Sequence, residues 1–230
     1  MSDLALLDLD IFAMRAAFSA EEETEEFIPC SRADKLIEDC LSDLGCTEYE
    51  GWLSGKNNFR YQVFPEYKRR RVNTPRPKWE QQVKQHLVES WQANTSDGCE
   101  ADDMLGVRSM LYQKQENVTP IIVSIDKDLD MIPGWHYNFV KKEKYIVTDE
   151  QAIYNFQYQL IVGDATDGIF GVPRYGPIKA ERLLQSLSSA EERFDAIRDL
   201  YSCDDAMLMN GQCLWIWREL DGIWKLPFTE

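Results

Sequence analysis

Eight carboxylates in four short groups constrain this chain more than any other feature, because the groups that begin at Asp8, Asp126 and Asp164 each follow an apolar segment at a strand-like position. Carboxylates repel one another, so gathering them in one crevice costs free energy unless a multivalent cation lies among them. The eight are Asp8, Glu100, Asp102, Asp103, Asp126, Asp128, Asp164 and Asp167. Hard oxygen ligands of this kind suit Mg²⁺ or Mn²⁺ rather than zinc. We therefore expect a fold that brings the four groups to one metal-binding crevice.

Such a crevice has a definite chemistry. Clustered carboxylates commonly hold two metal ions, roughly 3.5–4 Å apart, and the ions hydrolyse phosphodiesters by in-line attack. The sequence therefore predicts a metal-dependent nuclease.

Each acidic group also has an ordinary explanation. The Glu-Ala-Asp-Asp sequence at 100–103 would complement the dipole of a helix that begins there, and the aspartates of the fourth group are common turn residues. A calcium loop starting at Asp126 is excluded, because Met131 stands where such a loop needs glycine and Tyr137 where it needs glutamate. None of these explanations accounts for all four groups in this order and setting.

Length and composition fit one large domain, or one domain with a small appendage. A chain of 230 residues buries about 70% of its unfolded surface, so its fold needs neither disulfides nor zinc. Its six cysteines include no Cys-x-x-Cys pair, and two histidines are too few to favour a structural zinc site. No apolar run approaches the roughly 20 residues of a membrane span, and the N-terminus lacks the basic region of a signal peptide. We therefore predict a cytoplasmic protein with free thiols.

The net charge of −15 is unusual for a protein that binds a polyanion. Locally the balance reverses, because the stretch from Arg60 to Lys78 holds seven basic residues against one acid, Glu66. Taken alone, a basic run is as readily a solvated face as a nucleic-acid surface. Beside a carboxylate-rich catalytic centre, whose cations would offset part of the negative charge, we interpret it as a surface that follows DNA.

Hydrophobic periodicity and turn residues predict alternating strands and helices. Strands are expected at about 4–10, 49–53, 120–125, 137–140 and 144–147, and helices at about 13–19, 31–44, 77–93, 100–115, 148–162 and 189–201, with Thr148 as an N-cap. A solvated acidic loop is expected at 21–26 and a long loop or arch at 54–78. This alternation favours an α/β fold with a mostly parallel sheet and helices on both faces, in which sites form beyond the carboxyl ends of the strands. Asp8 and Asp126 are predicted to lie at such ends.

The acidic groups and their surroundings also resemble a known family, the structure-specific 5′ nucleases. That family comprises flap endonucleases, the 5′→3′ exonuclease domain of bacterial DNA polymerase I, and phage 5′→3′ exonucleases. The matching sequences are Leu7-Asp8-Leu9-Asp10, Phe59-Arg60, Pro65-Glu66-Tyr67-Lys68 with Arg71, Glu100-Ala101-Asp102-Asp103, Asp126-Lys127-Asp128, and Gly163 to Gly168, followed by Gly171 to Pro177, Lys179, Ala180, Leu183 and Leu184. They occur in family order over residues 4–187, and the chain looks most similar to short phage exonucleases.

The resemblance implies a PIN-like fold with a basic arch and a helix-three-turn-helix module that binds DNA. We expect an α/β nuclease core at 1–162, with the arch at about 54–95. The remainder, 163–230, is expected to hold the module and a C-terminal region that packs back on the core. Within 171–187 we expect two short helices around a glycine-containing turn.

The resemblance also implies roles for individual residues. Ligands of the catalytic metal are matched by Asp8, Glu100, Asp102 and Asp126. That metal or its outer shell would be held by Asp103 and Asp128. A second metal site is matched by Asp164 and Asp167, with Asp128. Lys68 and Arg71 match a basic pair that engages the scissile phosphate. DNA contacts are expected from Arg60, Tyr67, Lys68, Arg69, Arg70, Arg71, Gly171, Val172, Gly176 and Lys179.

The implied activity is cleavage of duplex DNA from 5′ ends and at 5′ flaps, with two Mg²⁺ or Mn²⁺ ions, 5′-phosphate products, and removal of RNA from RNA–DNA hybrids. The resemblance further implies K⁺ at the helix-three-turn-helix, a monomer in the cytoplasm (the host's, for a phage protein), a replication polymerase as partner, and no membrane. Two alternatives stay open. One is a PIN-like ribonuclease, which would not need the segment 171–184, and the other is a catalytically weak DNA-binding protein.

Two positions depart from the family pattern. Leu53 stands six residues before Phe59, where the family usually has an aspartate, and Phe170 replaces a common proline. The first departure puts the shell of the catalytic metal in question, with Asp10 as a nearby carboxylate. Near the C-terminus, Trp215, Trp217 and Trp224 are expected to seal a core rather than to stack on bases.

Overall fold

The computed structural model describes residues 2–227 and has a six-stranded sheet in the order β3-β2-β1-β4-β5-β6. The strands are β1 (Ser2–Asp8), β2 (Glu48–Lys56), β3 (Asn94–Asp97), β4 (Val118–Val123), β5 (Gly134–Asn138) and β6 (Glu143–Val147). The first five are parallel to their neighbours, and β6 is antiparallel to β5. The predicted fold class, a mostly parallel central sheet flanked by helices, is confirmed.

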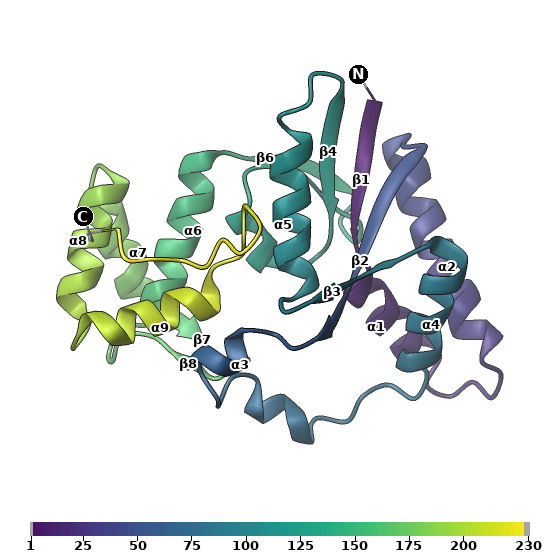
Figure 1. Ribbon diagram of the computed structural model, residues 1–230, viewed down its shortest axis with the longest axis horizontal. Coiled ribbons are helices and arrows are strands. Elements are labelled where there is room, and N and C mark those ends of the chain that lie inside the picture. The colour runs from purple at the N-terminus through teal and green to yellow at the C-terminus, as the bar shows by residue number, and fades with distance from the viewer. Residues whose placement is uncertain (1, 228–230) are drawn as a thin grey trace.

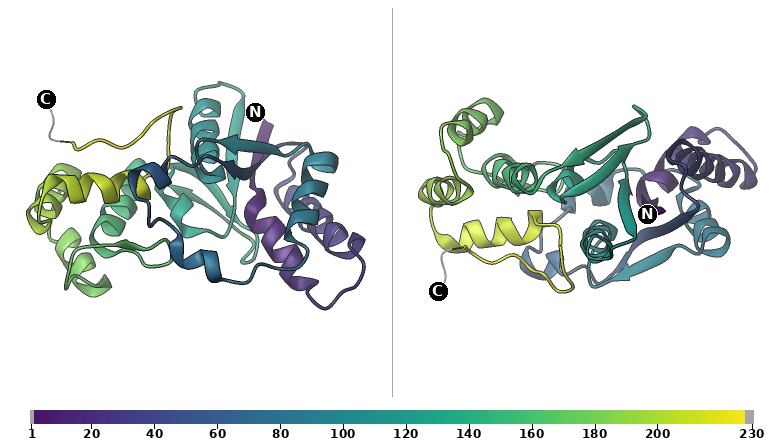
Figure 2. Two further views of the ribbon diagram at one scale, coloured as in Figure 1. Left: turned by 60° about the horizontal axis from the view of Figure 1, so that its bottom comes forward. Right: turned by 90° about the horizontal axis from the view of Figure 1, so that it is seen from above.

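Both faces of the sheet are buried, and this explains why its central strands are continuous apolar runs. Because alternate residues of a strand point to opposite faces, Ala5 and Leu7 of β1 join one hydrophobic cluster while Leu4 and Leu6 join another. The first cluster lies under α1 (Leu9–Ser19), α2 (Phe27–Leu44) and α4 (Glu80–Trp91), which also pack on one another. The second lies under α5 (Ala101–Tyr112), so the sheet stands between these helices (Figures 1 and 2).

The later helices gather around α6 (Asp149–Val162) in a third hydrophobic cluster. They are α7 (Pro177–Gln185), α8 (Ala190–Leu200) and α9 (Asp204–Leu214), and a two-stranded hairpin of β7 (Gly163–Asp164) and β8 (Ile169–Phe170) precedes them. Trp224 packs on Phe156 of α6, with ring centroids 5.4 Å apart, and Trp217 stacks on Phe59 at 5.1 Å. Both tryptophans are buried, and the half-buried Trp215 packs on Phe156 with ring centroids 4.9 Å apart, so the predicted core role of all three is confirmed. No helix in residues 2–227 is long and apolar enough to cross a membrane.

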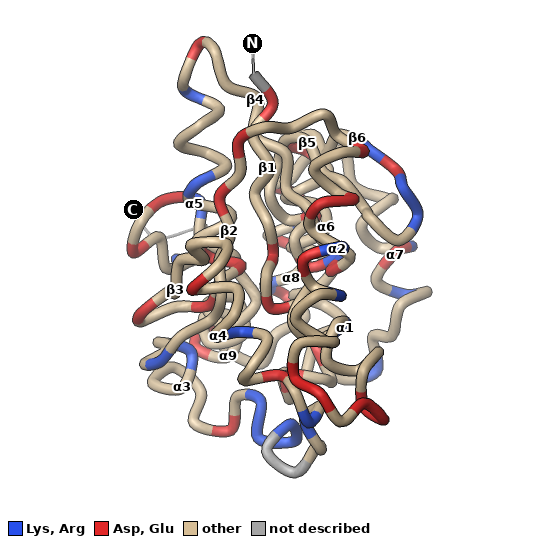
Figure 3. Tube along the Cα trace, turned by 90° about the vertical axis from the view of Figure 1, so that its right-hand side faces the viewer, with Lys and Arg blue, Asp and Glu red and all other residues tan. Residues whose placement is uncertain are grey.

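A long connection between β2 and α4, residues 57–79, is termed the basic segment below. It holds only short helices, α3 (Arg60–Val63) and the 3₁₀ helix η1 (Arg69–Asn73), as expected for a stretch without periodicity. It crosses below the end of the sheet toward which β1 runs (Figure 1), and its Lys and Arg residues gather there (Figure 3). The predicted irregular connection is confirmed, whereas its role as an arch stays a prediction.

Several element boundaries differ from those predicted. α1 begins at Leu9 directly after β1, so Asp10 lies in a helix rather than in a strand. The short polar strand β3 was not predicted, because Asn94–Asp97 lacks apolar alternation. Residues 171–187 hold one helix, α7, instead of two. The first of the two predicted helices does not form, because the Val172 amide donates to the Ile161 carbonyl at 2.8 Å and turns the chain back against the end of α6.

Leu53 is 3% exposed and packs in the cluster under α1, α2 and α4. Beside it, the amide of Ser54 donates to Asp10 Oδ2 at 2.8 Å, so the carboxylate of Asp10 lies next to the position where the family usually has an aspartate. Leu53 is therefore a core residue in this chain.

We expect Leu53→Asp to lower the free energy of unfolding by about 3 kcal/mol or more, because burying an unpaired carboxylate is costly. Urea denaturation measures the change. Leu53→Met is the matched control and should cost less than about 1.5 kcal/mol, since it keeps the volume and apolar character. An aspartate variant as stable as the methionine variant would mean that the side chain at 53 reaches solvent.

Candidate metal and nucleic-acid site

The ends of β1 and β4 bring two aspartates together. Asp8 is the last residue of β1, and Asp126 follows β4, which pairs with β1 in parallel. Ser124 links them, because its hydroxyl donates to Asp8 Oδ2 at 2.6 Å and accepts from the Asp126 amide at 3.0 Å. The predicted meeting of these two residues at the carboxyl edge of the sheet is confirmed. The role of Ser124 was not predicted; its signal was a small hydroxyl residue directly after an apolar strand.

The Glu-Ala-Asp-Asp group lies at the start of α5, as the helix-dipole explanation requires. Glu100 and Asp103 form a capping box, in which each side chain accepts from the other residue's backbone amide. Asp102 points elsewhere, into the crevice, where the charges of Asp8, Glu100 and Asp126 act on it. Helix capping and crevice formation therefore use different members of the same group.

Burial and crowding of like charges raise carboxyl pKa values across the crevice. Burial, and then the charges of Asp10 and Asp126, raise the pKa of Asp8 to about 7. Burial and the neighbouring carboxylates raise the pKa of Asp102 well above its usual value. The pKa of Asp128 rises to about 6, first through burial and then through Asp126. Ionised carboxylates here are destabilising without a counter-charge, which is the condition that a bound cation relieves.

The fourth acidic group lies on the β7–β8 hairpin. Asp164 Oδ1 accepts from the Thr166 amide at 2.7 Å, so this aspartate forms the turn as its ordinary explanation proposed. Asp167 Oδ2 accepts from the Tyr67 hydroxyl at 3.0 Å. A cavity of about 540 Å³ opens between the third and fourth groups, and Asp126, Asp128, Asp164 and Arg71 are among its lining residues. The third and fourth acidic groups, more than 30 residues apart in sequence, thus line the same cavity.

Two cations of the basic segment lie against the carboxylates. The ammonium of Lys68 donates to Glu100 and lies 3.6 Å from Asp167 Oδ2, and Arg71 pairs with Asp167 Oδ1 at 2.6 Å. Lys68 adopts a left-handed backbone with φ of 54°, and its amide donates to the Asp167 carbonyl at 2.9 Å. Burial would raise the pKa of Glu100, but Lys68 and Arg60 hold it below its usual value. The basic segment is therefore bound directly to the acidic crevice.

The donor set suits a hard cation, although its oxygens are directed at groups of the chain itself. Glu100 faces Lys68, Asp8 faces Ser124, and Gln159 donates to Asp128. Accordingly, in residues 2–227 no three His, Cys, Asp or Glu side chains are arranged as a ready-made metal site. The carboxylates with raised pKa values still fit a divalent ion, because oxygen ligands and excess negative charge are what such an ion needs.

Four residues with expected site roles make structural contacts. Asp103 is fully buried and pairs with Arg60, with Nη1–Oδ2 at 2.5 Å and Nη2–Oδ1 at 2.9 Å, so neither faces a metal or DNA. Tyr67 is 2% exposed, with its hydroxyl on Asp167 and Glu100, which removes it from direct DNA contact. Val172 is buried, and its amide is already bonded to Ile161. The expected DNA contacts of Arg60, Tyr67 and Val172 are corrected, whereas a place for Asp103 in the outer shell of the metal stays a prediction, because its partner Arg60 lies 4.0 Å from Glu100 Oε2.

The other expected DNA-contacting residues differ in their surroundings. Arg69 is exposed and pairs with Glu66, and Arg70 lies over the ring of Phe170 at 5.6 Å. Gly176 is the exposed N-cap of α7, and Lys179 of that helix donates to the Arg174 carbonyl at 3.1 Å. Gly171 serves packing, because a Cβ there would lie 2.2 Å from the Ile161 carbonyl oxygen.

Comparison with known proteins is consistent with this arrangement. Residues 4–157 match the family model described as 5′-3′ exonuclease, N-terminal resolvase-like domain. A 5′-3′ exonuclease of Mycoplasma genitalium is 31% identical over 228 residues, covering 87% of this chain and 77% of that protein. DNA polymerase I of Bacillus caldotenax is 29% identical over 167 residues, covering 64% of this chain and 18% of the polymerase. The bacteriophage T5 D15 flap endonuclease, solved in a complex with DNA and metal ions, shares the fold with a TM-score of 0.67 at 18% identity, covering 92% of this chain and 89% of that one.

Neighbouring aspartates 102 and 103 should respond oppositely to substitution. Without divalent metal, Asp103→Asn should lower the free energy of unfolding by about 3–5 kcal/mol, because it leaves Arg60 buried without its anion. Asp102→Asn should raise it, since the raised pKa of Asp102 means that its ionised form is destabilising at pH 7. Chemical denaturation in EDTA measures both. Two variants that are destabilised alike would contradict the separation of structural and crevice carboxylates.

Proposed function

Because the chain belongs to the 5′-3′ exonuclease family, we propose that it hydrolyses DNA phosphodiesters from 5′ ends and at 5′ flaps, with divalent metal and with 5′-phosphate products. The observation that carries this proposal is the crevice in which Asp8, Asp102 and Asp126 meet beside Lys68 of the basic segment. Removal of RNA from RNA–DNA hybrids belongs to the same proposal, because a site that holds only phosphate and metal does not require a deoxyribose.

The metal ligands divide into two sets. Asp8, Glu100, Asp102 and Asp126 would hold a first ion, and Asp128, Asp164 and Asp167 would hold a second one. When bound, Mg²⁺ or Mn²⁺ would lower the pKa of a water and offset charge on the phosphoryl oxygens. Asp103 is outside both sets, and its role is to fix the start of α5 and Arg60.

The chain's own residues orient and neutralise the phosphate. Lys68 and Arg71 lie on the same carboxylates that would hold the ions, so ions and phosphate together would free both cations to face the substrate. Their positive charge would then stabilise the negative charge that develops on the phosphoryl group. Ser124 keeps Asp8 and Asp126 in register through its two hydrogen bonds.

Duplex binding would use exposed cations of two segments and the N-terminus of a helix. Arg69 and Arg70 belong to the basic segment, and Lys179 lies in the first turn of α7, whose N-cap is the exposed Gly176. Such contacts grip phosphates without reading sequence and weaken with salt. A K⁺ ion near α7, a division into 1–162 and 163–230, and a polymerase partner are further parts of the proposal. The DNA polymerase I relative motivates the last of these.

The test is release of label from a duplex with a labelled 5′ flap, measured with Mg²⁺ and with EDTA. We expect cleavage of the flap with Mg²⁺ and none with EDTA. We also expect no cleavage of a single-stranded RNA control, which a PIN-like ribonuclease would prefer. Duplex binding without any cleavage would favour the catalytically weak DNA-binding protein instead.

Asp126→Asn should abolish cleavage and leave duplex affinity within about threefold, because it removes one metal-binding charge and eases the approach of the phosphates. Single-turnover cleavage and fluorescence anisotropy separate the two effects. Wild-type cleavage by this variant in Mg²⁺ would remove Asp126 from the ligand set.

Lys68→Ala should slow single-turnover cleavage by about 100-fold or more, with a small loss of affinity, because its charge acts at the reacting phosphate. Arg69→Ala is the matched control from the same segment. It should weaken binding and lower the slope of log affinity against log salt by about one, as expected for a backbone phosphate contact. Similar losses from both variants would contradict this division.

A further inference from the structure

Phe170, the last residue of β8, is a large apolar side chain that is 69% exposed. Single exposed apolar residues are common on proteins, so exposure alone assigns no role. In Figure 1, β8 lies beside α3 of the basic segment, and Gly163, which pairs with Phe170, is among the residues that line the cavity of about 540 Å³. The chain carries this ring three residues after Asp167.

The backbone that carries the ring is fixed by several contacts. Gly163 pairs with Phe170 in the hairpin, and the side-chain amide of Asn210 donates to the Phe170 carbonyl at 2.8 Å. The following residue, Gly171, packs so closely on the end of α6 that it has no room for a Cβ. The hairpin is in turn bound to the basic segment through the Lys68 amide and the Asp167 carbonyl. Because this backbone is already fixed, little backbone entropy is lost when a ligand stacks on the ring.

A cation lies on the ring. The guanidinium carbon of Arg70 is 5.6 Å from the Phe170 centroid, and Arg69 and Arg71 flank Arg70 in η1. An exposed aromatic ring beside positive groups is the arrangement with which proteins bind unpaired nucleotides, because bases stack on the ring and arginines bind the phosphates. The charge next to the ring therefore favours a nucleic acid strand over an apolar protein segment.

We propose that Phe170 and Arg70 form a stacking site for an unpaired nucleobase of the DNA strand, next to the acidic crevice. The inference rests on the proposed nuclease function. It adds that the protein binds a flap more tightly when one particular unpaired position carries a base than when that position is abasic. Stacking requires only a π face, so the site would accept any base.

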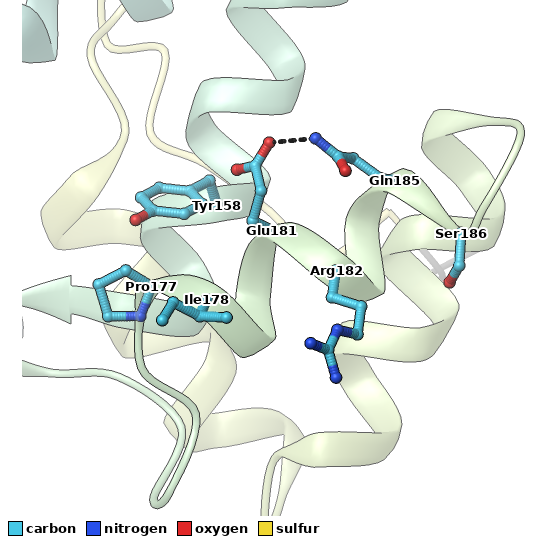
Figure 4. Close-up of a pocket in the computed structure, with 7 residues that line it drawn as sticks. All are labelled: Tyr158, Pro177, Ile178, Glu181, Arg182, Gln185 and Ser186. Atoms are coloured by element: carbon cyan, nitrogen blue, oxygen red, sulfur yellow. Dashed lines mark hydrogen bonds between the residues drawn. The ribbon is translucent and has the colours of Figure 1, made fainter.

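A groove lies on α7. It has a volume of about 690 Å³, and its lining residues include Tyr158, Ile178, Glu181 and Arg182 (Figure 4). Its charged residues are of both signs, and Glu181 accepts hydrogen bonds from Gln185 and Tyr154. No occupant is indicated there. Ile178, which is 76% exposed, supplies a matched control, because it is apolar and lies near the DNA-facing start of α7 but cannot stack.

The test compares 5′-flap duplexes that carry either normal bases or a single abasic site at each of the first unpaired positions. Dissociation constants are measured in EDTA by fluorescence anisotropy. For the wild type we expect the abasic site at one position to weaken binding about 5- to 100-fold, the equivalent of a lost base–aromatic stack. Phe170→Ala should bind intact and abasic flaps equally, while Phe170→Trp and Ile178→Ala should keep the wild-type difference.

An equal abasic penalty in wild type and Phe170→Ala would overturn the stacking site, and so would the absence of any penalty in the wild type. If those results come with normal Mg²⁺-dependent flap cleavage, the inference alone fails. If the wild type neither binds nor cleaves any flap, the proposed function fails and the inference falls with it. A 2-aminopurine at the sensitive position adds a direct readout, because its fluorescence should be quenched by wild type and not by Phe170→Ala.

Discussion

Mutual repulsion among carboxylates at the carboxyl edge of a parallel sheet is the constraint on which the rest of this structure depends. The parallel pairing of β1 and β4 places Asp8 and Asp126 at one edge, and the start of α5 adds Asp102. Burial makes the repulsion stronger, as the raised pKa values of Asp8 and Asp102 record. The chain tolerates this cost by directing its own donors at the carboxylates, from Ser124 on the sheet to Lys68 on the basic segment.

A second electrostatic link, the buried pair of Arg60 and Asp103, joins parts of the chain that are distant in sequence. Arg60 lies at the start of the basic segment, and Asp103 lies in the first turn of α5. Arg60 also donates to the carbonyls of Cys213 and Trp215, and the amide of Trp217 donates to Asp103. An ion pair this deeply buried contributes little net stability but is costly to break. It therefore fixes where the basic segment leaves the fold, and with it the approach of Lys68 to the crevice.

Much of the fold and of the crevice could be predicted from the sequence, because both follow from local patterns. Apolar runs followed by aspartate predicted the strand ends that carry Asp8 and Asp126, and Thr148 was a correct N-cap with a complete capping box. What failed depended on distant parts of the chain. The capping box gives Asp103 a local role, but its burial depends on Arg60, 43 residues earlier, and on the amide of Trp217, 114 residues further along. Likewise, the Val172 amide donates to the Ile161 carbonyl at the end of α6, so a turn forms where the glycines predicted a pair of helices.

Direct measurement of divalent metal binding tests most sharply that the crevice carboxylates form a metal site. The experiment titrates Mn²⁺ into the wild-type protein and into Asp102→Asn and counts bound ions by electron paramagnetic resonance. We expect two specific ions per wild-type chain, displaced by excess Mg²⁺, and fewer or more weakly bound ions in the variant. Equal binding by the two proteins, or no specific binding by either, would contradict a metal site at these carboxylates.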